Sequence, residues 1–316
     1  MELRGPEWRP DGRGDLTPRP MKPVEVLRTT RALVKANLAP IASVMAVFVF
    51  PVYLAWVFVS PDDMSWTSPF MPPLPLATLT WFGSLPVAAA GRGAVILLGF
   101  AGVGLAVAMI TRLTARSYLS RHPSAPERPA AVGRRLPAVV AAFASIHLLE
   151  AGGLLLFIAT GLALTRWSSA APATVVALPV LAAIPAIALL AMTLLFVTMP
   201  ALVVERRTVL GALRRSLTLI RRRFWSTAAV VTLGGLAAMI LLVAVHFPFA
   251  LMFSASNFDG RSPPGAWVIE SLGGMLASLA AIPFFVTLAT VVYFDLRVRR
   301  DGLTREAIAR DLRSLG

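Results

Sequence analysis

The sequence predicts an all-α, polytopic membrane protein with six transmembrane helices paired as three hairpins. The first observation is composition: 57% of the 316 residues are hydrophobic and 15% are charged, whereas soluble chains are about 45–50% apolar and about 25% charged. The second is length, because several nearly uncharged stretches reach the roughly 20 apolar residues that a helix needs to cross the hydrocarbon core. No alternating strand pattern of the outer-membrane barrel type is present, and only helices or closed barrels satisfy the backbone in lipid. The expected spans are about residues 39–59, 93–111, 137–164, 173–199, 226–252 and 268–293.

The distribution of positive charge predicts the orientation of these helices. The net charge is +14, and 27 of the 30 Lys and Arg residues fall in four segments on one predicted side: 1–38, 112–136, 200–225 and 294–316. This asymmetry follows the positive-inside rule and places both termini in the cytoplasm. Because membrane topology explains the positive charge, nucleic-acid binding is not expected. The expected partners are membrane lipids, chiefly anionic inner-leaflet headgroups. The large excess of Arg over Lys suggests a GC-rich bacterial genome, and hence the bacterial plasma membrane.

The segments outside the spans are expected to be short and polar. Residues 1–20, rich in Pro, Gly and charge, are predicted to form a disordered cytoplasmic tail. Residues 21–300 form the expected transmembrane domain, and residues 301–316 a cytoplasmic C-terminal tail. The first 38 residues lack the features of a cleaved signal peptide, so the first span is expected to act as an uncleaved signal-anchor. The absence of cysteine excludes a disulfide framework and a thiolate metal site.

A basic amphipathic segment, called an elbow segment below, precedes each predicted hairpin. The first begins at Pro23, the second ends with Arg134 and Arg135, and the third covers residues 205–225. Apolar and basic residues alternate in them at helical spacing, which is typical of helices that lie in the membrane interface. The elbow segments recur about every 90–100 residues, which suggests a threefold repeat of parallel topology.

The third elbow segment has the densest positive charge. Its apolar residues, spaced three and four apart, are expected to form one helix face against lipid or neighbouring helices, with the arginines reaching phosphates from the other face. An interfacial anchor is the favoured interpretation, and recognition of one particular lipid is the alternative. The apolar residues are Val209, Leu210, Leu213, Leu217 and Ile220, and the expected lipid contacts are Arg206, Arg207, Arg214, Arg215, Arg221, Arg222 and Arg223.

Small residues at four-residue spacing predict close helix packing. The pairs are Gly102–Ala106, Gly104–Ala108, Gly234–Ala238 and Gly273–Ala277. In membranes this spacing lets helix backbones approach each other, so these residues are interpreted as packing positions.

His147 and Glu150 form the candidate polar site within the membrane. Glu150 lies 13 residues past Pro137, roughly 20 Å along a helix, and intramembrane charges are functional candidates by default. His147 is one turn earlier, so the two side chains can share a helix face. They could hold a proton in a relay or line a polar pathway, or they could form a structural contact with Glu150 protonated.

Recognisable catalytic and metal-binding motifs are absent from the sequence. No Walker loop, zinc-protease motif or nucleophile elbow is present. The three histidines do not cluster with other ligands, so neither a metal nor another cofactor is expected. The sequence therefore favours a protein that is not an enzyme, with an intramembrane enzyme as a distant third possibility.

Three segments carry a resemblance to a known group of proteins: the third elbow segment, the ending after the last predicted span, at Tyr293 and Asp295, and the opening from Pro20 through Glu25-Val26-Leu27 with Arg28 and Arg31. All three resemble uncharacterised prokaryotic integral membrane proteins related to the membrane domain of glycerophosphoryl diester phosphodiesterase. The resemblance covers residues from about 20 to 312. It implies a six-helix membrane domain but no phosphodiesterase activity, because the chain lacks the soluble catalytic domain that such enzymes carry. The family-like residues are Glu205, Ser216, Tyr293, Asp295 and Arg297.

The leading functional hypothesis is a non-enzymatic, membrane-organising or docking module of the cell membrane, with elbow segments that anchor it at the inner leaflet. The competing hypothesis is a transporter or channel for a small or lipid-like solute, with Glu150 and His147 lining the path. The sequence identifies no protein partner.

Overall fold

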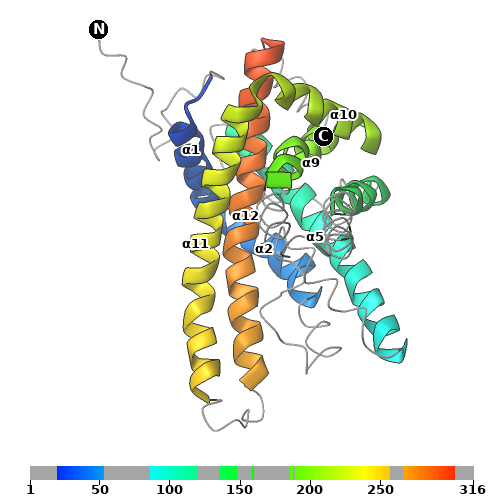
Figure 1. Cartoon of the computed structure of the whole chain (residues 1–316), viewed down its shortest axis with the longest axis vertical. Helices are drawn as coiled ribbons and strands as arrows, with labels where there is room; N and C mark the ends of the chain where they lie inside the picture. Colours follow the sequence, from blue (N-terminus) through cyan, green and yellow to red (C-terminus); the bar gives the residue numbers. More distant parts are fainter. Residues whose placement is uncertain are drawn as a thin grey trace, which may run out of the picture.

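The computed structural model describes residues 20–52, 86–119, 135–147, 159, 186–187, 189–256 and 266–302. Every regular element in these ranges is helical, with no strand, which confirms the all-α class for the described part of the chain. The elements are α1 (Pro23–Ala36), α2 (Leu38–Phe48), α5 (Pro86–Leu119), α9 (Thr198–Val204), α10 (Val209–Ile220), the 3-10 turn η2 (Arg221–Arg223), α11 (Phe224–Ser256) and α12 (Ala266–Asp301) (Figure 1). Two short apolar helices, Leu136–His147 and Leu189–Val204, complete them, and the second contains α9.

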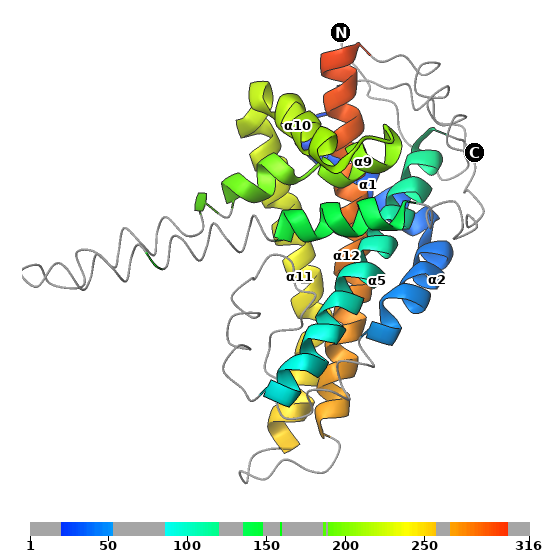
Figure 2. The ribbon, with the colours of Figure 1, turned by 90° about the vertical axis from the view of Figure 1, so that its right-hand side faces the viewer.

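Helix α12 lies at the centre of the arrangement. It runs beside α11 as a long hairpin, and it also contacts α1, α2, α5, α9 and α10 (Figures 1 and 2). Its inward residues Leu288, Val291, Tyr293 and Phe294 are fully buried. Near its C-terminal end, the ring of Phe294 stacks on Tyr118 of α5 at a centroid distance of 5.1 Å. The other elements are therefore positioned relative to α12.

Two helical segments of the described residues are long and apolar enough to cross a membrane, namely Val209–Met252 and Leu272–Asp301. They correspond to the predicted spans five and six. The pair α1 and α2 adds a third crossing if the bent pair is one span. Most of predicted spans three and four, and the end of span one, fall outside the described residues.

The first elbow segment forms α1, and the chain bends by 75° between α1 and α2. Asn37 lies at the bend, where its side-chain amide donates to the carbonyl of Leu33 (2.8 Å) and its side-chain oxygen accepts from the hydroxyl of Ser117 (2.7 Å). These bonds satisfy polar groups that a helix break exposes. Helix α2 is also interrupted at Val49, two residues before Pro51, but the large bend is at Asn37.

Three of the predicted small residues lie at close helix contacts. A Cβ atom added to Gly102 would lie 2.4 Å from the carbonyl oxygen of Phe48, so α5 meets the backbone of α2 there. Gly234 lies against the side chain of Leu288, and Gly273 against that of Phe249, both between α11 and α12. Close packing of backbones thus replaces the hydrophobic driving force that lipid does not supply.

Replacing Gly102 with alanine should destabilise the protein, because the new methyl group meets a backbone oxygen that cannot rotate away. The expected loss is about 1–3 kcal/mol, the usual cost of overpacking, measured by thermal unfolding in detergent. Gly235→Ala is the matched control, since its Cβ would meet only the end of Met192 at 3.8 Å. Equal stability of the two variants would contradict the close contact.

Candidate functional site

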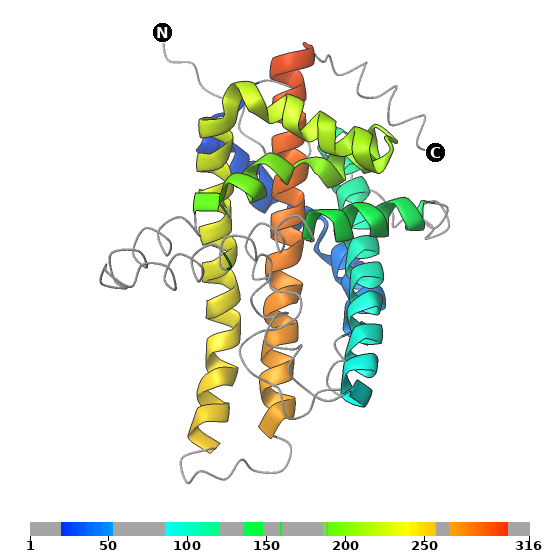
Figure 3. The same ribbon diagram turned by 45° about the vertical axis from the view of Figure 1, so that its right-hand side comes forward.

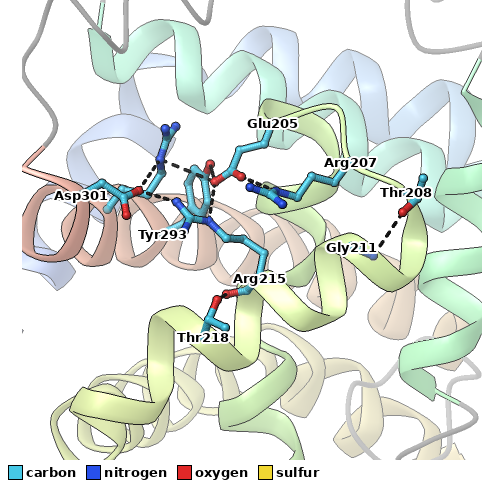
Figure 4. Close-up of polar contacts among 9 residues, drawn as sticks. Glu205, Arg207, Thr208, Gly211, Arg215, Thr218, Tyr293 and Asp301 are labelled. Atoms are coloured by element: carbon cyan, nitrogen blue, oxygen red, sulfur yellow. Dashed lines mark hydrogen bonds and ion pairs between the residues drawn. The ribbon is translucent and has the colours of Figure 1, made fainter.

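The candidate site is built around a tight turn that joins α9 to α10. Helix α9 ends at Val204, and Arg206 takes a left-handed backbone conformation with φ of 53°. The turn then ends at Thr208, whose hydroxyl oxygen accepts a hydrogen bond from the backbone N–H of Gly211 (3.2 Å) and caps α10 (Figure 4). A left-handed residue is a common way to end a helix, although glycine usually fills it. The turn fixes Glu205 between the two helices.

Glu205 is the shared acceptor of a group of polar side chains. One carboxylate oxygen, Oε1, accepts from the hydroxyl of Tyr293 at 2.8 Å and from Nε of Arg215 at 2.9 Å. The other oxygen, Oε2, accepts from Arg207 (Figure 4). Nε of Arg297 lies 3.6 Å from Oε1 and adds a further ion pair. The carboxylate thereby joins α10 to the C-terminal end of α12.

Asp301 provides a second anionic anchor for the same arginines. It pairs with the guanidinium of Arg215 and, at 3.4 Å, with Nε of Arg297. Tyr293, Arg297 and Asp301 are spaced four residues apart, so they share one face of α12. The guanidinium of Arg297 also lies over the ring of Tyr293, 5.6 Å from its centroid. We call these three residues, with Glu205 and Arg215, the α12 clamp.

A different face of the α12 end holds the start of α1. Asp295 accepts from the backbone N–H of Met21 at 2.7 Å, and Arg299 donates to the carbonyl of Met21 at 2.7 Å. Asp295 and Arg299 also pair with each other at 2.8 Å. One turn of helix therefore binds both backbone groups of a single residue, which lies two positions before the first elbow segment. We call this contact the Met21 clasp.

The electrostatics of the clamp favour an ionised Glu205. Its side chain is 9% exposed, and burial by itself raises the pKa of the carboxyl. Hydrogen bonds from Arg207, Tyr293 and Arg215, with the nearby charge of Arg215, outweigh that effect, so the pKa of Glu205 lies below its ordinary value. The clamp is thus a satisfied set of charges, and its chemistry is that of a structural ion network.

Among the described residues, two of the seven arginines of the third elbow segment form ion pairs and five do not. Arg215 is 15% exposed in its side chain and turned into the clamp, so it is placed differently from the outward arginines with which the sequence grouped it. Arg207 pairs with Glu205 while remaining 43% exposed. The other five are exposed and have no ion pair among the described residues: Arg206, Arg214, Arg221, Arg222 and Arg223.

The remaining family-like residue, Ser216, is part of the packing beneath α10. It is fully buried, and its hydroxyl donates to the carbonyl of Leu194 at 2.6 Å. This bond ties α10 to the helix that ends in α9. Four of the five family-like residues therefore hold the third elbow segment in place, and Asp295 holds the first.

The predicted intramembrane pair lies only partly within the described residues. His147 ends the helix Leu136–His147 and is half-buried, with its ring edge-to-face on Phe143 at a centroid distance of 4.4 Å. Glu150 lies outside the described residues.

Sequence reasoning missed the partners that complete both contacts, namely Met21, Arg299 and Asp301. The four-residue spacing of Tyr293, Arg297 and Asp301 was the available signal, because it places a donor, a cation and an anion on one helix face. Within the described residues, no group of three or more His, Asp or Glu side chains could hold a metal ion.

Comparisons with known proteins add no relative. No family model, curated protein or solved structure matches the chain.

Replacing Glu205 with glutamine should destabilise the protein by about 3 kcal/mol, because Arg215 and Arg297 lose their shared buried counter-charge. Arg207→Gln is the matched control, since Arg207 is largely exposed and exposed pairs contribute about 0–1 kcal/mol. Thermal unfolding of both variants in detergent measures the difference. A Glu205 variant no less stable than the Arg207 variant would show that the clamp does not hold α10.

The clamp also predicts the direction of a pH dependence. The pKa of Glu205 is lowered in the folded protein, so its contribution to stability is fully present above the ordinary value of 4.5. This contribution is lost as the pH falls from there through the lowered pKa of the folded state. Wild-type melting temperature should therefore fall over this range more steeply than that of Glu205→Gln, and parallel curves would exclude Glu205 as a source.

Proposed function

We propose that this chain is a non-enzymatic, multi-pass protein of the bacterial plasma membrane whose elbow segments form an anchoring and docking layer at the inner leaflet. The observation that carries the proposal is the pair of contacts at the end of α12. Its two faces hold the first elbow segment through Met21 and the third through Glu205. Both contacts fix the position of helices that carry exposed basic side chains.

The membrane assignment rests on the two candidate spanning helices together with the predicted six-span organisation. Helix α11 supports it further, because apolar residues such as Leu236 and Ile240 are 54% and 67% exposed. Apolar side chains exposed along a whole helix suit contact with lipid tails. The α12 clamp then lies at the end of the hairpin where positive charge gathers, which is the cytoplasmic end by the positive-inside rule.

The transporter alternative depends on Glu150, which lies outside the described residues. It stays a hypothesis from the sequence, tested by proton-coupled flux of a Glu150→Gln, His147→Ala variant in proteoliposomes.

The absence of cysteine makes the proposed orientation directly testable. In cells, a single cysteine at Thr218, in the third elbow segment, should react with a membrane-impermeant maleimide only after permeabilisation. A cysteine at Arg261, between predicted spans five and six, should react in intact cells. The reversed pattern would overturn the cytoplasmic placement of the elbow segments.

An anchoring layer should make the protein more stable in an anionic bilayer, because a ligand that binds only the folded state stabilises it. The melting temperature should be several degrees higher in nanodiscs containing phosphatidylglycerol than in phosphatidylcholine alone, and salt should reduce the difference. Equal melting temperatures in the two lipids would overturn the anchoring role.

A further inference from the structure

The outward face of α10 carries a stripe of alternating apolar and basic residues. Leu210, Arg214 and Leu217 follow the spacing i, i+4 and i+7, so they lie along one face of the helix. Arg221, the first residue of η2, continues the same spacing at i+11. All four are exposed, with Leu210 at 57% and Leu217 at 42%. In the sequence-based prediction these leucines share one apolar face with Ile220, which is buried in the structure. The face buried in the protein instead contains Ala212, Ser216, Leu219 and Ile220.

Helix α1 repeats this spacing with one apolar and three basic residues. Val24, Arg28, Arg31 and Lys35 have the same i, i+4, i+7 and i+11 spacing, and all are exposed, with Val24 at 55%. The opposite face, with Val26, Thr30 and Leu33, is buried. Two elbow segments therefore present exposed apolar and basic residues at the same spacing, with more basic residues in α1. We call the two sets the α10 stripe and the α1 stripe.

Both stripes lie at one end of the α11–α12 hairpin, the end where α11 begins and α12 finishes (Figures 1 and 3). The Met21 clasp and the α12 clamp hold their helices there. The α10 stripe ends at Arg221, the first residue of η2, and η2 leads directly into α11. Trp225, in the first turn of α11, is 82% exposed. Tryptophan concentrates at the headgroup level of membranes, so its exposure marks that level beside the α10 stripe.

We propose that the two stripes are binding sites for the phosphate headgroups of anionic phospholipids. This proposal rests on the proposed function and names the ligand of its anchoring layer. The basic side chains would contact the phosphates, while Leu210, Leu217 and Val24 enter the upper acyl region. This combination of charge and apolar area is what binds an amphipathic helix to an anionic surface.

The composition of the stripes favours lipid over another acidic partner. A water-exposed polyanion would satisfy the cations but leave Leu210 and Leu217 in water, whereas a lipid offers phosphate and hydrocarbon together. The apolar exposed face of α11 continues from the same place, so hydrocarbon is adjacent. Arg215 is not part of this binding site because its guanidinium already pairs with Glu205 and Asp301. Arg206 is excluded because it lies in the turn before α10.

The test uses a single cysteine at the exposed Thr218, labelled with a fluorescent donor, in phosphatidylcholine nanodiscs. Energy transfer to a trace of acyl-labelled phosphatidylglycerol is compared with transfer to acyl-labelled phosphatidylcholine. The wild-type ratio should exceed one, because each arginine near an anionic surface favours binding by roughly 5-fold. In Arg214→Gln with Arg221→Gln, the ratio should fall to about one.

The matched control is Arg206→Gln with Arg300→Gln, which removes two exposed arginines away from the α10 stripe. The control variant should keep the wild-type ratio. If its ratio falls as far as that of the stripe variant, general surface charge explains the lipid enrichment and the proposed binding site is wrong. Inorganic phosphate at constant ionic strength should leave the ratio unchanged. Displacement by phosphate would overturn the lipid assignment and indicate a soluble phosphate-bearing ligand.

The α1 stripe is tested with the donor at Ala36→Cys and the variant Arg28→Gln with Arg31→Gln. A wild-type ratio of one at either label overturns the proposal for that stripe. None of the substituted residues belongs to the α12 clamp or the Met21 clasp, so an unchanged melting temperature in phosphatidylcholine separates lost lipid contact from lost folding. If the stripe variants lose the lipid preference but their melting temperature still rises in phosphatidylglycerol, the proposed anchoring function stands and the stripes are not its lipid-binding sites.

Discussion

The carboxylate of Glu205 is the point at which the turn between α9 and α10 meets the end of α12. It accepts hydrogen bonds from Arg207 beside it, Arg215 on α10 and Tyr293 on α12. Without that shared acceptor, two arginine side chains that are 15% and 10% exposed would face each other with only Asp301 between them. The placement of α10, and of everything α10 exposes, therefore depends on one negative charge in a strongly positive segment.

A buried ion network of this kind contributes more to geometry than to net stability. Desolvation of the charges offsets much of their attraction, so an apolar contact of similar size could be as stable. An apolar contact would, however, tolerate rotation of α10 about its own axis. Paired charges with hydrogen-bond directionality tolerate it poorly, because a turned helix leaves a buried charge without its partner. The clamp thus determines which arginines point outward and which one points inward.

The sequence was enough to locate the first and third elbow segments and the last hairpin but not the clamp. Amphipathic spacing and the long apolar runs predict α1, α10, α11 and α12, because membrane length and helix period act locally. Arg214 and Arg215 are indistinguishable by composition, and their different surroundings follow from a rotation of about 100° around α10 relative to a core that the local sequence does not reveal. Met21 could not be predicted either, since the clasp uses its backbone groups rather than its side chain.

The Met21 clasp has a consequence for biogenesis. Its partners are separated by 274 residues, and Glu205 and Tyr293 by 88, so neither contact can form until α12 has been synthesised. During translation, α1 leaves the ribosome long before the helix that will hold it. If the elbow segments bind the inner leaflet as we propose, the bilayer surface would hold α1 while its protein partner is still missing. The end of α12, made after both elbow segments, then joins them through Met21 and Glu205.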